Sequence, residues 1–293
     1  MANFTRRRMV TTGAIAAAGV ATTASIGSAS AKTTTAQANS TVTSPEGNFA
    51  GKVVLITGAT SGIGKATARA FAQERASVFF CGRREELGRQ VEAEIRATGG
   101  EATYMKADVR SATEVEAFVA GCISQYGRLD VAFNNAGTDY PPATIAETDI
   151  EAFDDLMSTN ARGVFLGMKY EIPHLLESNG AIINNASIGG HRAFPNIVGY
   201  GASKAAVIHM TKMAAQEYGT VRINAIAPGF VDTPMGDRVK RDWDVTEEQL
   251  VAPYPMQRAA QPEEIAEAVM WLASDASSYV SGMRLDIDGG GLG

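Results

Sequence analysis

Residues 52–64 read Lys52-Val-Val-Leu-Ile-Thr57-Gly58-Ala-Thr-Ser-Gly62-Ile-Gly64, and this pattern joins a strand to a helix through a glycine-rich turn. Its first six residues form a short apolar run between two glycines, which predicts a buried strand, and residues 65–75 have the polarity and alanine content of a helix. Glycines in such a strand-to-helix turn let the backbone approach a pyrophosphate, whose charge is favoured by the free N–H groups of the helix start. Taken alone, the stretch also fits a glycine-rich turn without a ligand.

The same kind of apolar run recurs along the chain. Strand-like runs occupy residues 52–57, 77–81, 102–107, 129–133, 181–186, 221–227 and 284–288. Helical stretches alternate with these runs at regular intervals, which predicts an α/β fold with one doubly wound parallel sheet and helices on both faces. A chain of 293 residues allows one large domain or two small ones, and the unbroken alternation favours one.

A second motif combines a phenol with an ammonium group. Among eight tyrosines, Tyr200 is the one with a lysine, Lys204, four residues on. On a helix the two side chains share a face, so the ammonium favours the ionised phenol, whose ordinary pKa near ~10 is too high for proton transfer at neutral pH. Ser187 follows the apolar run 181–186, at the strand end where open α/β sheets bind ligands. A chance surface contact between the tyrosine and the lysine is the alternative.

Together these motifs resemble the short-chain dehydrogenase/reductase family. The carrying residues are Gly58, Gly62 and Gly64, then Asn134-Asn-Ala-Gly137, Ser187 and Tyr200-x-x-x-Lys204. The resemblance extends from about Phe49 to Gly290 and implies a Rossmann-type catalytic domain over residues 49–293. Further positions match the family pattern: Asp108-Val109, Asn160, Pro228-Gly229 and Thr233.

The resemblance implies four catalytic residues. Ser187 is expected to hydrogen-bond the substrate oxygen, and Tyr200 to exchange a proton with it. Lys204 is expected to lower the pKa of that tyrosine and to hold the nicotinamide ribose, while Asn160 anchors a proton relay. No Gly-x-Ser-x-Gly elbow surrounds Ser187, so its hydroxyl is predicted to stabilise charge rather than to act as a nucleophile.

The resemblance also implies which residues bind the dinucleotide. They are Gly58, Ser61, Gly62, Ile63, Gly64, Asp108, Val109, Asn135, Ala136, Gly137, Tyr200, Lys204, Pro228, Gly229 and Thr233.

The end of the second strand favours NADP(H) over NAD(H). A carboxylate there would accept the ribose hydroxyls of NAD, but the chain has Arg83 and Arg84 instead. Guanidinium groups match the oxygens of a 2′-phosphate, so both arginines are predicted to bind the cofactor. The alternative is that they pair with Glu85 and Glu86 in solvent, which leaves NAD(H) possible.

The predicted activity is hydride transfer between nicotinamide and a secondary alcohol or ketone with NADP(H). The alternatives are an NAD-dependent alcohol or sugar dehydrogenase of the same fold, an acyl-carrier reductase, and a non-catalytic nucleotide-binding or sensor protein. Residues 235–261 are expected to form a lid over the substrate. Four predicted lining residues indicate a mostly apolar small-molecule substrate: Phe194, Phe230, Met235 and Trp243.

Residues 1–31 have the three parts of an export signal. Three arginines, residues 6–8, precede an uncharged segment, residues 11–31, that ends in Ala29-Ser-Ala31. The arginines and the weak hydrophobicity resemble a twin-arginine leader, so we expect a periplasmic protein with a flexible segment at residues 32–48. A disordered tail and a membrane anchor are the alternatives, and a nonfunctional signal would leave the protein in the cytoplasm.

Other partners are constrained by composition. The chain has 26 basic and 32 acidic residues without a basic stripe, so a nucleic-acid partner is not expected. Three histidines lack metal-ligand spacing, which predicts no metal site. His191 follows Ser187 closely and is expected in solvent, with a place in the substrate pocket as the alternative. Cys81 and Cys122 are predicted to be packed thiols. The resemblance implies a homotetramer formed through the helices of Asn160 and Tyr200 and the C-terminal strand, with no membrane contact.

Overall fold

The computed structural model describes residues 47–291, which contain a seven-stranded parallel sheet. The spatial order of its strands is β3-β2-β1-β4-β5-β6-β7. The strands are β1 (Val53–Ile56), β2 (Ser77–Gly82), β3 (Glu101–Lys106), β4 (Val131–Asn134), β5 (Ala181–Asn185), β6 (Arg222–Pro228) and β7 (Arg284–Ile287). Each agrees with its predicted run to within two residues at either end.

The α-helices are α1 (Gly62–Gln73), α2 (Glu85–Ala97), α3 (Ala112–Tyr126), α4 (Ile150–Leu156), α5 (Gly163–Ser178), α6 (Val198–Glu217), α7 (Pro234–Asp242), α8 (Glu247–Val251) and α9 (Pro262–Ala273). A π-helical turn, η1 (Met157–Arg162), joins α4 to α5. Two short 3₁₀ turns are η2 (Ile188–Gly190) and η3 (Asp275–Ser277).

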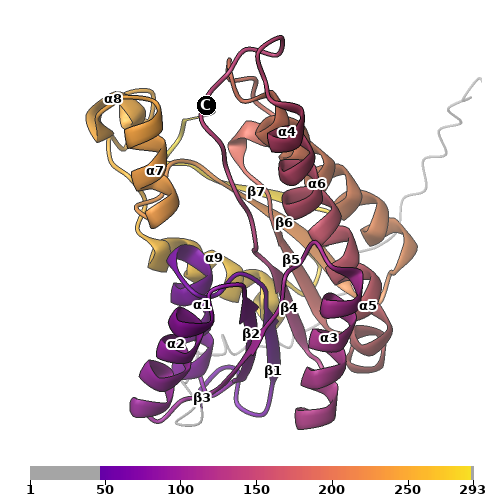
Figure 1. Ribbon diagram of the computed structural model, residues 1–293. Coiled ribbons are helices and arrows are strands. Elements are labelled where there is room, and N and C mark those ends of the chain that lie inside the picture. Colours follow the sequence, from indigo (N-terminus) through magenta and orange to yellow (C-terminus); the bar gives the residue numbers. More distant parts are fainter. Residues whose placement is uncertain (1–46, 292–293) are drawn as a thin grey trace, which may run out of the picture. The chain divides into compact units, whose positions relative to one another are not determined.

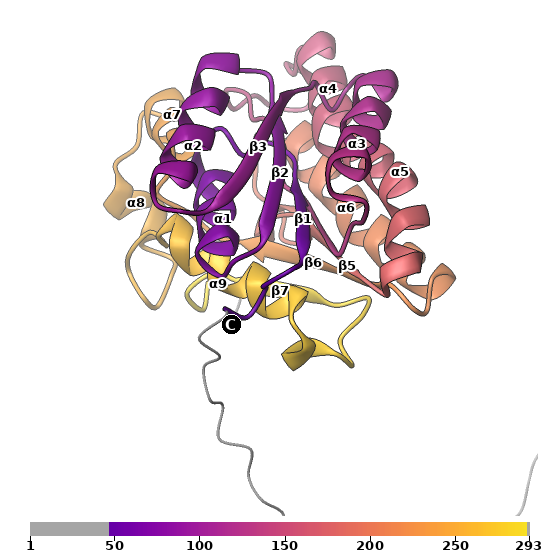
Figure 2. The same cartoon turned by 90° about the horizontal axis from the view of Figure 1, so that it is seen from below.

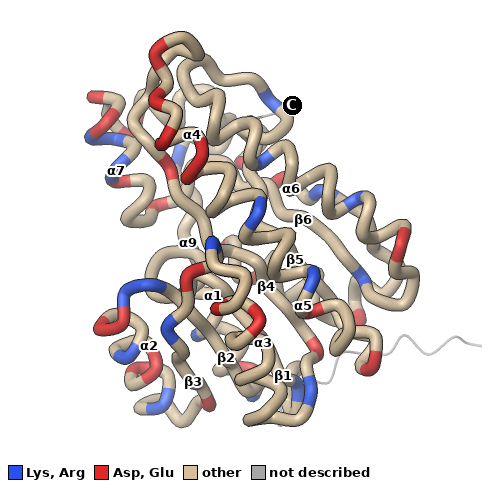
Figure 3. Tube along the Cα trace, turned by 45° about the vertical axis from the view of Figure 1, so that its right-hand side comes forward, with Lys and Arg blue, Asp and Glu red and all other residues tan. Residues whose placement is uncertain are grey.

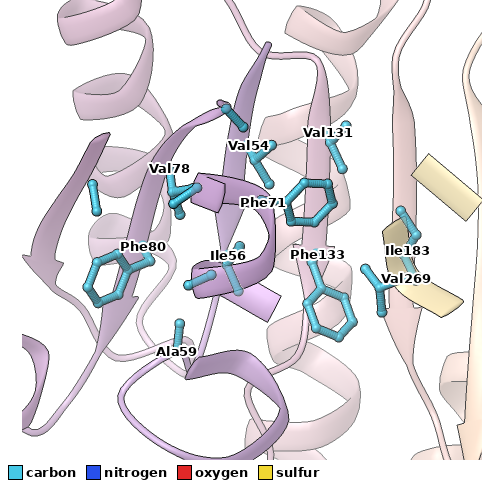
Figure 4. Packing of buried hydrophobic residues seen from close by; sticks show 14 of the residues in the cluster. Val54, Ile56, Ala59, Phe71, Val78, Phe80, Val131, Phe133, Ile183 and Val269 are labelled. Carbon is cyan, nitrogen blue, oxygen red and sulfur yellow. The ribbon is translucent and has the colours of Figure 1, made fainter. Parts of the chain in front are cut away.

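The central strands β1 and β4 are buried along their whole length because both faces of the sheet are covered there. On β1, Val54 and Ile56 belong to one buried cluster, and Val53 and Leu55 belong to another. This alternation is the period of two that every strand imposes on its side chains. Figure 4 shows the first cluster, in which Phe71 of α1 packs among the strand side chains.

Helices α1, α2 and α9 cover one face of the sheet, and α3, α5 and α6 cover the other (Figures 1 and 2). This arrangement confirms the predicted doubly wound α/β fold. The chain leaves β1 toward β2 on one side, whereas β4 pairs with β1 on its other side. The strand order therefore reverses between β1 and β4, the place where open α/β sheets bind ligands at the strands' carboxyl ends.

Several predictions concern the surface or the ends of the chain. The predicted export signal, residues 1–31, and most of segment 32–48 lie outside the described residues. Within the described part, no helix has both the length and the apolar character needed to cross a membrane. Figure 3 shows both signs of charge distributed over the outer helices and loops. Cys81 and Cys122 are buried in the core cluster that α3, α5 and α6 cover.

Candidate active site

A cleft of about 500 Å³ opens at the carboxyl ends of the strands. Loops that follow β1 through β6 all contribute to its walls. The predicted site residues that line it are Gly58, Ser61, Gly62, Ile63, Arg83, Arg84, Asp108, Val109, Asn135, Ala136, Gly137, Ser187, Tyr200, Lys204, Pro228, Gly229 and Thr233. The structure thus brings residues from six loops to one site. Gly64 and Asn160 do not line the cleft but lie behind residues that do.

The glycine turn after β1 lies directly against the loop after β4. Gly58 has a φ of +69°, and a Cβ atom there would lie 2.7 Å from the Cα atom of Ala136. A Cβ atom on Gly64 would lie 2.5 Å from the Asn135 side-chain nitrogen. Thr57 fixes this contact, because its hydroxyl oxygen accepts hydrogen bonds from the main-chain N–H groups of Asn135 and Ala136, at 3.0 and 3.1 Å.

The start of α1 is open toward the cleft. Ser61 occupies the N-cap position with an extended backbone, but its side chain makes no capping hydrogen bond, and the first turn carries no acidic residue. The first N–H groups of the helix therefore lack a side-chain partner. Together with the positive end of the helix dipole they favour an anion at this place.

Arg84 lies over this same turn. Its guanidinium donates to the hydroxyl oxygens of Thr60 and Ser61, at 2.8 and 2.6 Å. Burial and the nearby charges of Arg238 and Arg83 lower the pKa of Arg84. The guanidinium thus contacts hydroxyls beside the cleft, not Glu85 or Glu86, and the positive charge gathered there favours a phosphate group.

Ser187 and Tyr200 meet across Gly189. A Cβ atom placed on Gly189 would lie 3.5 Å from both the Ser187 hydroxyl oxygen and the Tyr200 ring. Ser187 follows β5, and Tyr200 lies in the first turn of α6. One turn later, the Lys204 ammonium donates to the Asn185 carbonyl oxygen at 2.7 Å and lies 5.8 Å from the Tyr200 ring centre.

The predicted effect of Lys204 on the pKa of Tyr200 stays a prediction, because the shift in this structure comes from other groups. Burial raises the pKa of Tyr200, a hydrogen bond with Ser187 lowers it, and the charge of Asp139 raises it further. The ammonium of Lys204 is directed at the Asn185 carbonyl rather than at the phenol. Burial also lowers the pKa of Lys204, to about 8.

Asn160 is fully buried in the π-helical turn η1. Its side-chain oxygen accepts from the Thr138 N–H at 2.8 Å, and its nitrogen donates to the Thr138 carbonyl at 3.0 Å. The same nitrogen reaches the Ser203 hydroxyl at 3.1 Å, and Ser203 donates to the Tyr200 carbonyl at 2.7 Å. Asn160 therefore ties the loop after β4 to the helix of Tyr200.

The remaining predicted residues line the two ends of the cleft. Asp108 is held by Arg110, with hydrogen bonds of 2.6 to 3.0 Å. Burial opposes its ionisation, but the contacts with Arg110 prevail and leave the pKa of Asp108 below its ordinary value. Thr233 caps α7, and its methyl group would lie 3.2 Å from a Cβ atom on Gly62, so α7 begins against the glycine turn.

Some lining residues differ from those predicted. Phe230, Met235 and Trp243 line the cleft as predicted, but Phe194 does not, because its ring lies against the guanidinium of Arg192, at 5.3 Å. His191 is not in the cleft either; its imidazole lies 3.3 Å from an Asp286 carboxylate oxygen.

The sequence reading missed several residues of the cleft. They include Thr138, Asp139, Tyr140 and Ile197, while Arg238 and Val239 belong to the predicted lid, residues 235–261, but were not singled out. The first three directly follow Asn134-Asn-Ala-Gly137, so extending that motif would have found them. Within residues 47–291 no group of three His, Cys, Asp or Glu side chains could hold a metal ion.

Comparison with known proteins identifies the family. A family model described as enoyl-(acyl carrier protein) reductase matches residues 58–291. The 2,5-dichloro-2,5-cyclohexadiene-1,4-diol dehydrogenase of Sphingobium indicum is 38% identical over 247 residues, which cover 83% of this chain and 98% of that protein. The cyclohexanol dehydrogenase of an Acinetobacter species is 40% identical over 244 residues, covering 82% of this chain and 95% of that protein.

A solved structure of actinorhodin polyketide ketoreductase with NADPH is 38% identical, with a TM-score of 0.78 over 82% of this chain and 96% of that one. The chain belongs to the short-chain dehydrogenase/reductase family. It is an oxidoreductase that acts on CH–OH groups with a nicotinamide cofactor.

Proposed function

We propose that the protein is an NADP(H)-dependent oxidoreductase that interconverts a secondary alcohol and a ketone. The observation that carries the proposal is the convergence of Ser187, Tyr200 and Lys204 in one cleft with an uncapped helix start and Arg84. The glycine turn supports it, because side chains at Gly58 or Gly64 would collide with the loop after β4.

Each catalytic side chain has a task that follows from its position. When bound, the nicotinamide supplies or accepts the hydride. Ser187 hydrogen-bonds the substrate oxygen, and Tyr200 gives that oxygen a proton during reduction or takes one during oxidation. Lys204 places a positive charge near the phenol and binds the ribose, while Asn160 holds the loop and helix that meet at Tyr200.

Proton transfer by Tyr200 is costly while its pKa is raised. In oxidation the phenol must lose its proton, and burial together with the charge of Asp139 opposes this step. The hydrogen bond from Ser187 assists it. We therefore expect alcohol oxidation to speed up as the pH rises and ketone reduction to be favoured near neutral pH.

The preference for NADP(H) rests on Arg84 and its surroundings. Its guanidinium lies on Thr60 and Ser61, at the edge of the cleft, with Arg83 beside it. Two guanidinium groups would be poorly placed next to bare ribose hydroxyls but well placed next to a 2′-phosphate. The NADPH-bound structural relative supports the same cofactor.

The substrate is proposed to be a compact, mostly apolar alcohol or ketone, of which alicyclic rings are the first candidates. The apolar side chains on the substrate side of the cleft are Ile197, Phe230, Met235, Val239 and Trp243. The two dehydrogenases reported above are named for six-membered alicyclic alcohols, which supports this class.

A turnover assay tests the proposed function. Purified protein is given NADPH with a panel of cyclic ketones, and NADP with the matching alcohols, and nicotinamide absorbance is followed. We expect turnover in the wild type and a loss of about 10²-fold or more in Tyr200→Phe, which lacks the hydroxyl that exchanges the proton. Nucleotide binding without turnover of any member of the panel would instead favour the non-catalytic alternative.

We also propose a homotetramer. Phe165 on α5 and Met213 on α6 are about half exposed, at 50% and 52%. Trp271 of α9, together with Tyr279 and Met283 before β7, exposes apolar surface at the other predicted interface. Exposed large apolar side chains on these segments support association there. The molar mass in solution, measured by light scattering, tests this assembly.

Export to the periplasm is proposed from residues 1–31 alone. Fractionation of cells that produce the full chain tests it, with Arg6→Lys/Arg7→Lys as the variant that blocks a twin-arginine route. We expect the wild type in the periplasm and the variant in the cytoplasm. Equal cytoplasmic amounts of both proteins would exclude a functional signal.

A further inference from the structure

An ion pair joins two segments that line the active-site cleft. The guanidinium of Arg238, on α7, contacts a carboxylate oxygen of Asp139, in the loop after β4. Both residues line the cleft, and the Asp139 side chain is only 13% exposed. Within the described residues, Arg238 is the one basic group that forms an ion pair with Asp139.

Each partner stands on an anchored segment. Thr138, the residue before Asp139, is held by two hydrogen bonds with the Asn160 side chain. On the other side, Thr233 caps α7 and packs against Gly62 in the glycine turn. Figure 1 shows α7 on one side of the space beyond the carboxyl ends of the strands and the segment that follows β4 on the other side. The ion pair therefore links α7, which overlaps the predicted lid at residues 235–261, to the loop after β4.

Asp139 also affects the phenol. Its negative charge acts on Tyr200 and raises the pKa of that residue. The other groups that face Tyr200 are the Ser187 hydroxyl from the loop after β5 and the Lys204 ammonium from its own helix. Arg238 brings a positive charge onto Asp139 from α7, and this charge reduces the field that Asp139 exerts on Tyr200.

We propose that Asp139 and Arg238 are positioning residues whose ion pair holds α7 over the cleft and compensates a carboxylate that lines the same cleft as Tyr200. This inference rests on the proposed function, since it assigns a task within that site. Under this inference, both the position of α7 over the cleft and the protonation of Tyr200 depend on the ion pair between Asp139 and Arg238.

Lid closure is measured through Trp243, the residue that ends α7 and lines the cleft. The chain has two tryptophans, so Trp271→Phe leaves Trp243 as the single reporter. In that background we compare acrylamide quenching for Asp139→Asn, Arg238→Gln and Arg238→Lys. The matched control is Asp237→Asn, which removes an ion pair of 3.0 Å with Lys240 inside α7.

We expect a quenching constant at least twofold higher in Asp139→Asn and Arg238→Gln, because the lid opens without its link. Arg238→Lys should restore most of the protection, and Asp237→Asn should match the parent protein. Equal quenching constants in all five proteins would show that the ion pair does not hold α7 over the cleft.

The second part of the inference, that Arg238 compensates the charge of Asp139, is measured by the pH dependence of alcohol oxidation at saturating nucleotide. Arg238→Gln leaves the negative charge of Asp139 uncompensated, so the midpoint of the rate-against-pH profile should move up by about 0.5 to 1 pH unit. Asp139→Asn removes the negative charge, so the midpoint should move down by a similar amount. The double variant should return toward the wild type, and Asp237→Asn should not move.

If the midpoints for Arg238→Gln and Asp139→Asn shift in the same direction, or do not shift, Arg238 does not compensate the charge of Asp139. A structural defect alone lowers the rate without producing opposite shifts. If the wild type turns over no alcohol or ketone, the proposed function fails, and the quenching result still decides whether the ion pair closes the lid. If the enzyme is active, but neither the quenching constants nor the midpoints of the pH profiles differ among the variants, this inference fails while the proposed function stands.

Discussion

The ammonium of Lys204 donates a hydrogen bond to the Asn185 carbonyl oxygen at 2.7 Å. Asn185 is the last residue of β5, and Lys204 lies in α6, so this contact ties the strand to the helix at the site. The same contact holds the ammonium over the ring of Tyr200. The lysine acts on the phenol through space, at 5.8 Å from the ring centre, and not through a hydrogen bond.

Replacing Lys204 with Met is expected to lower kcat by about 10²- to 10⁴-fold, because the positive charge that favours the ionised phenol is lost. Lys212→Met is the control, since Lys212 is exposed on the same helix. Steady-state kinetics of both variants check the prediction. A kcat in Lys204→Met within threefold of the Lys212→Met value would show that the ammonium is not needed.

Gly58→Ala is expected to weaken folding and nucleotide binding together. The new Cβ would meet the Ala136 backbone at 2.7 Å, and the φ of +69° adds strain of about 1 to 2 kcal/mol. Gly99→Ala separates the two causes, because Gly99 has a φ of +84° with nothing near its Cβ. Denaturant unfolding should show a larger loss for Gly58→Ala, and nucleotide titration should show lost binding in that variant alone.

Glu171 makes stability depend on pH. It is fully buried on α5, where Asn134 donates to one carboxylate oxygen at 2.9 Å and the other oxygen has no hydrogen-bond partner among residues 47–291. Burial raises the pKa of Glu171 from 4.5 to about 7, although the contact with Asn134 lowers it. Between these two pH values the folded state holds a proton that the unfolded state has released, so this stabilisation is lost as the pH rises.

Glu171→Gln should therefore be more stable than the wild type at pH 8, by about 2 to 3 kcal/mol, and nearly equal to it at pH 4.5. Urea unfolding at both pH values measures the difference. Glu177→Gln, at an exposed position of the same helix, should show no such dependence. A variant that is less stable than the wild type at pH 8 would contradict the assignment.

The sheet could be predicted from the sequence because its central strands are covered on both faces. Runs such as residues 53–56 are then apolar without interruption, and short polar or glycine-rich segments separate them. The glycine turn and the pair of Tyr200 with Lys204 could be predicted as well, since their chemistry depends on spacing within one segment.

Features that depend on contacts between distant segments could not be predicted. Asp139 and Arg238 are 99 residues apart, and neither lies in a recognisable pattern. The π-helical turn that carries Asn160 has no sequence signature, because it results from how α4 and α5 join. The raised pKa of Tyr200 follows from burial, which helical spacing to Lys204 does not reveal.

The cofactor is the central claim, and the dissociation constants of NADPH and NADH test it most directly. Both are measured by nicotinamide fluorescence for the wild type, Arg84→Ala and the control Arg69→Ala, whose side chain is exposed on α1. We predict at least tenfold tighter binding of NADPH by the wild type and by Arg69→Ala, and a loss of most of this preference in Arg84→Ala. Equal affinity for the two nucleotides in the wild type, or a ratio that Arg84→Ala leaves unchanged, would contradict it.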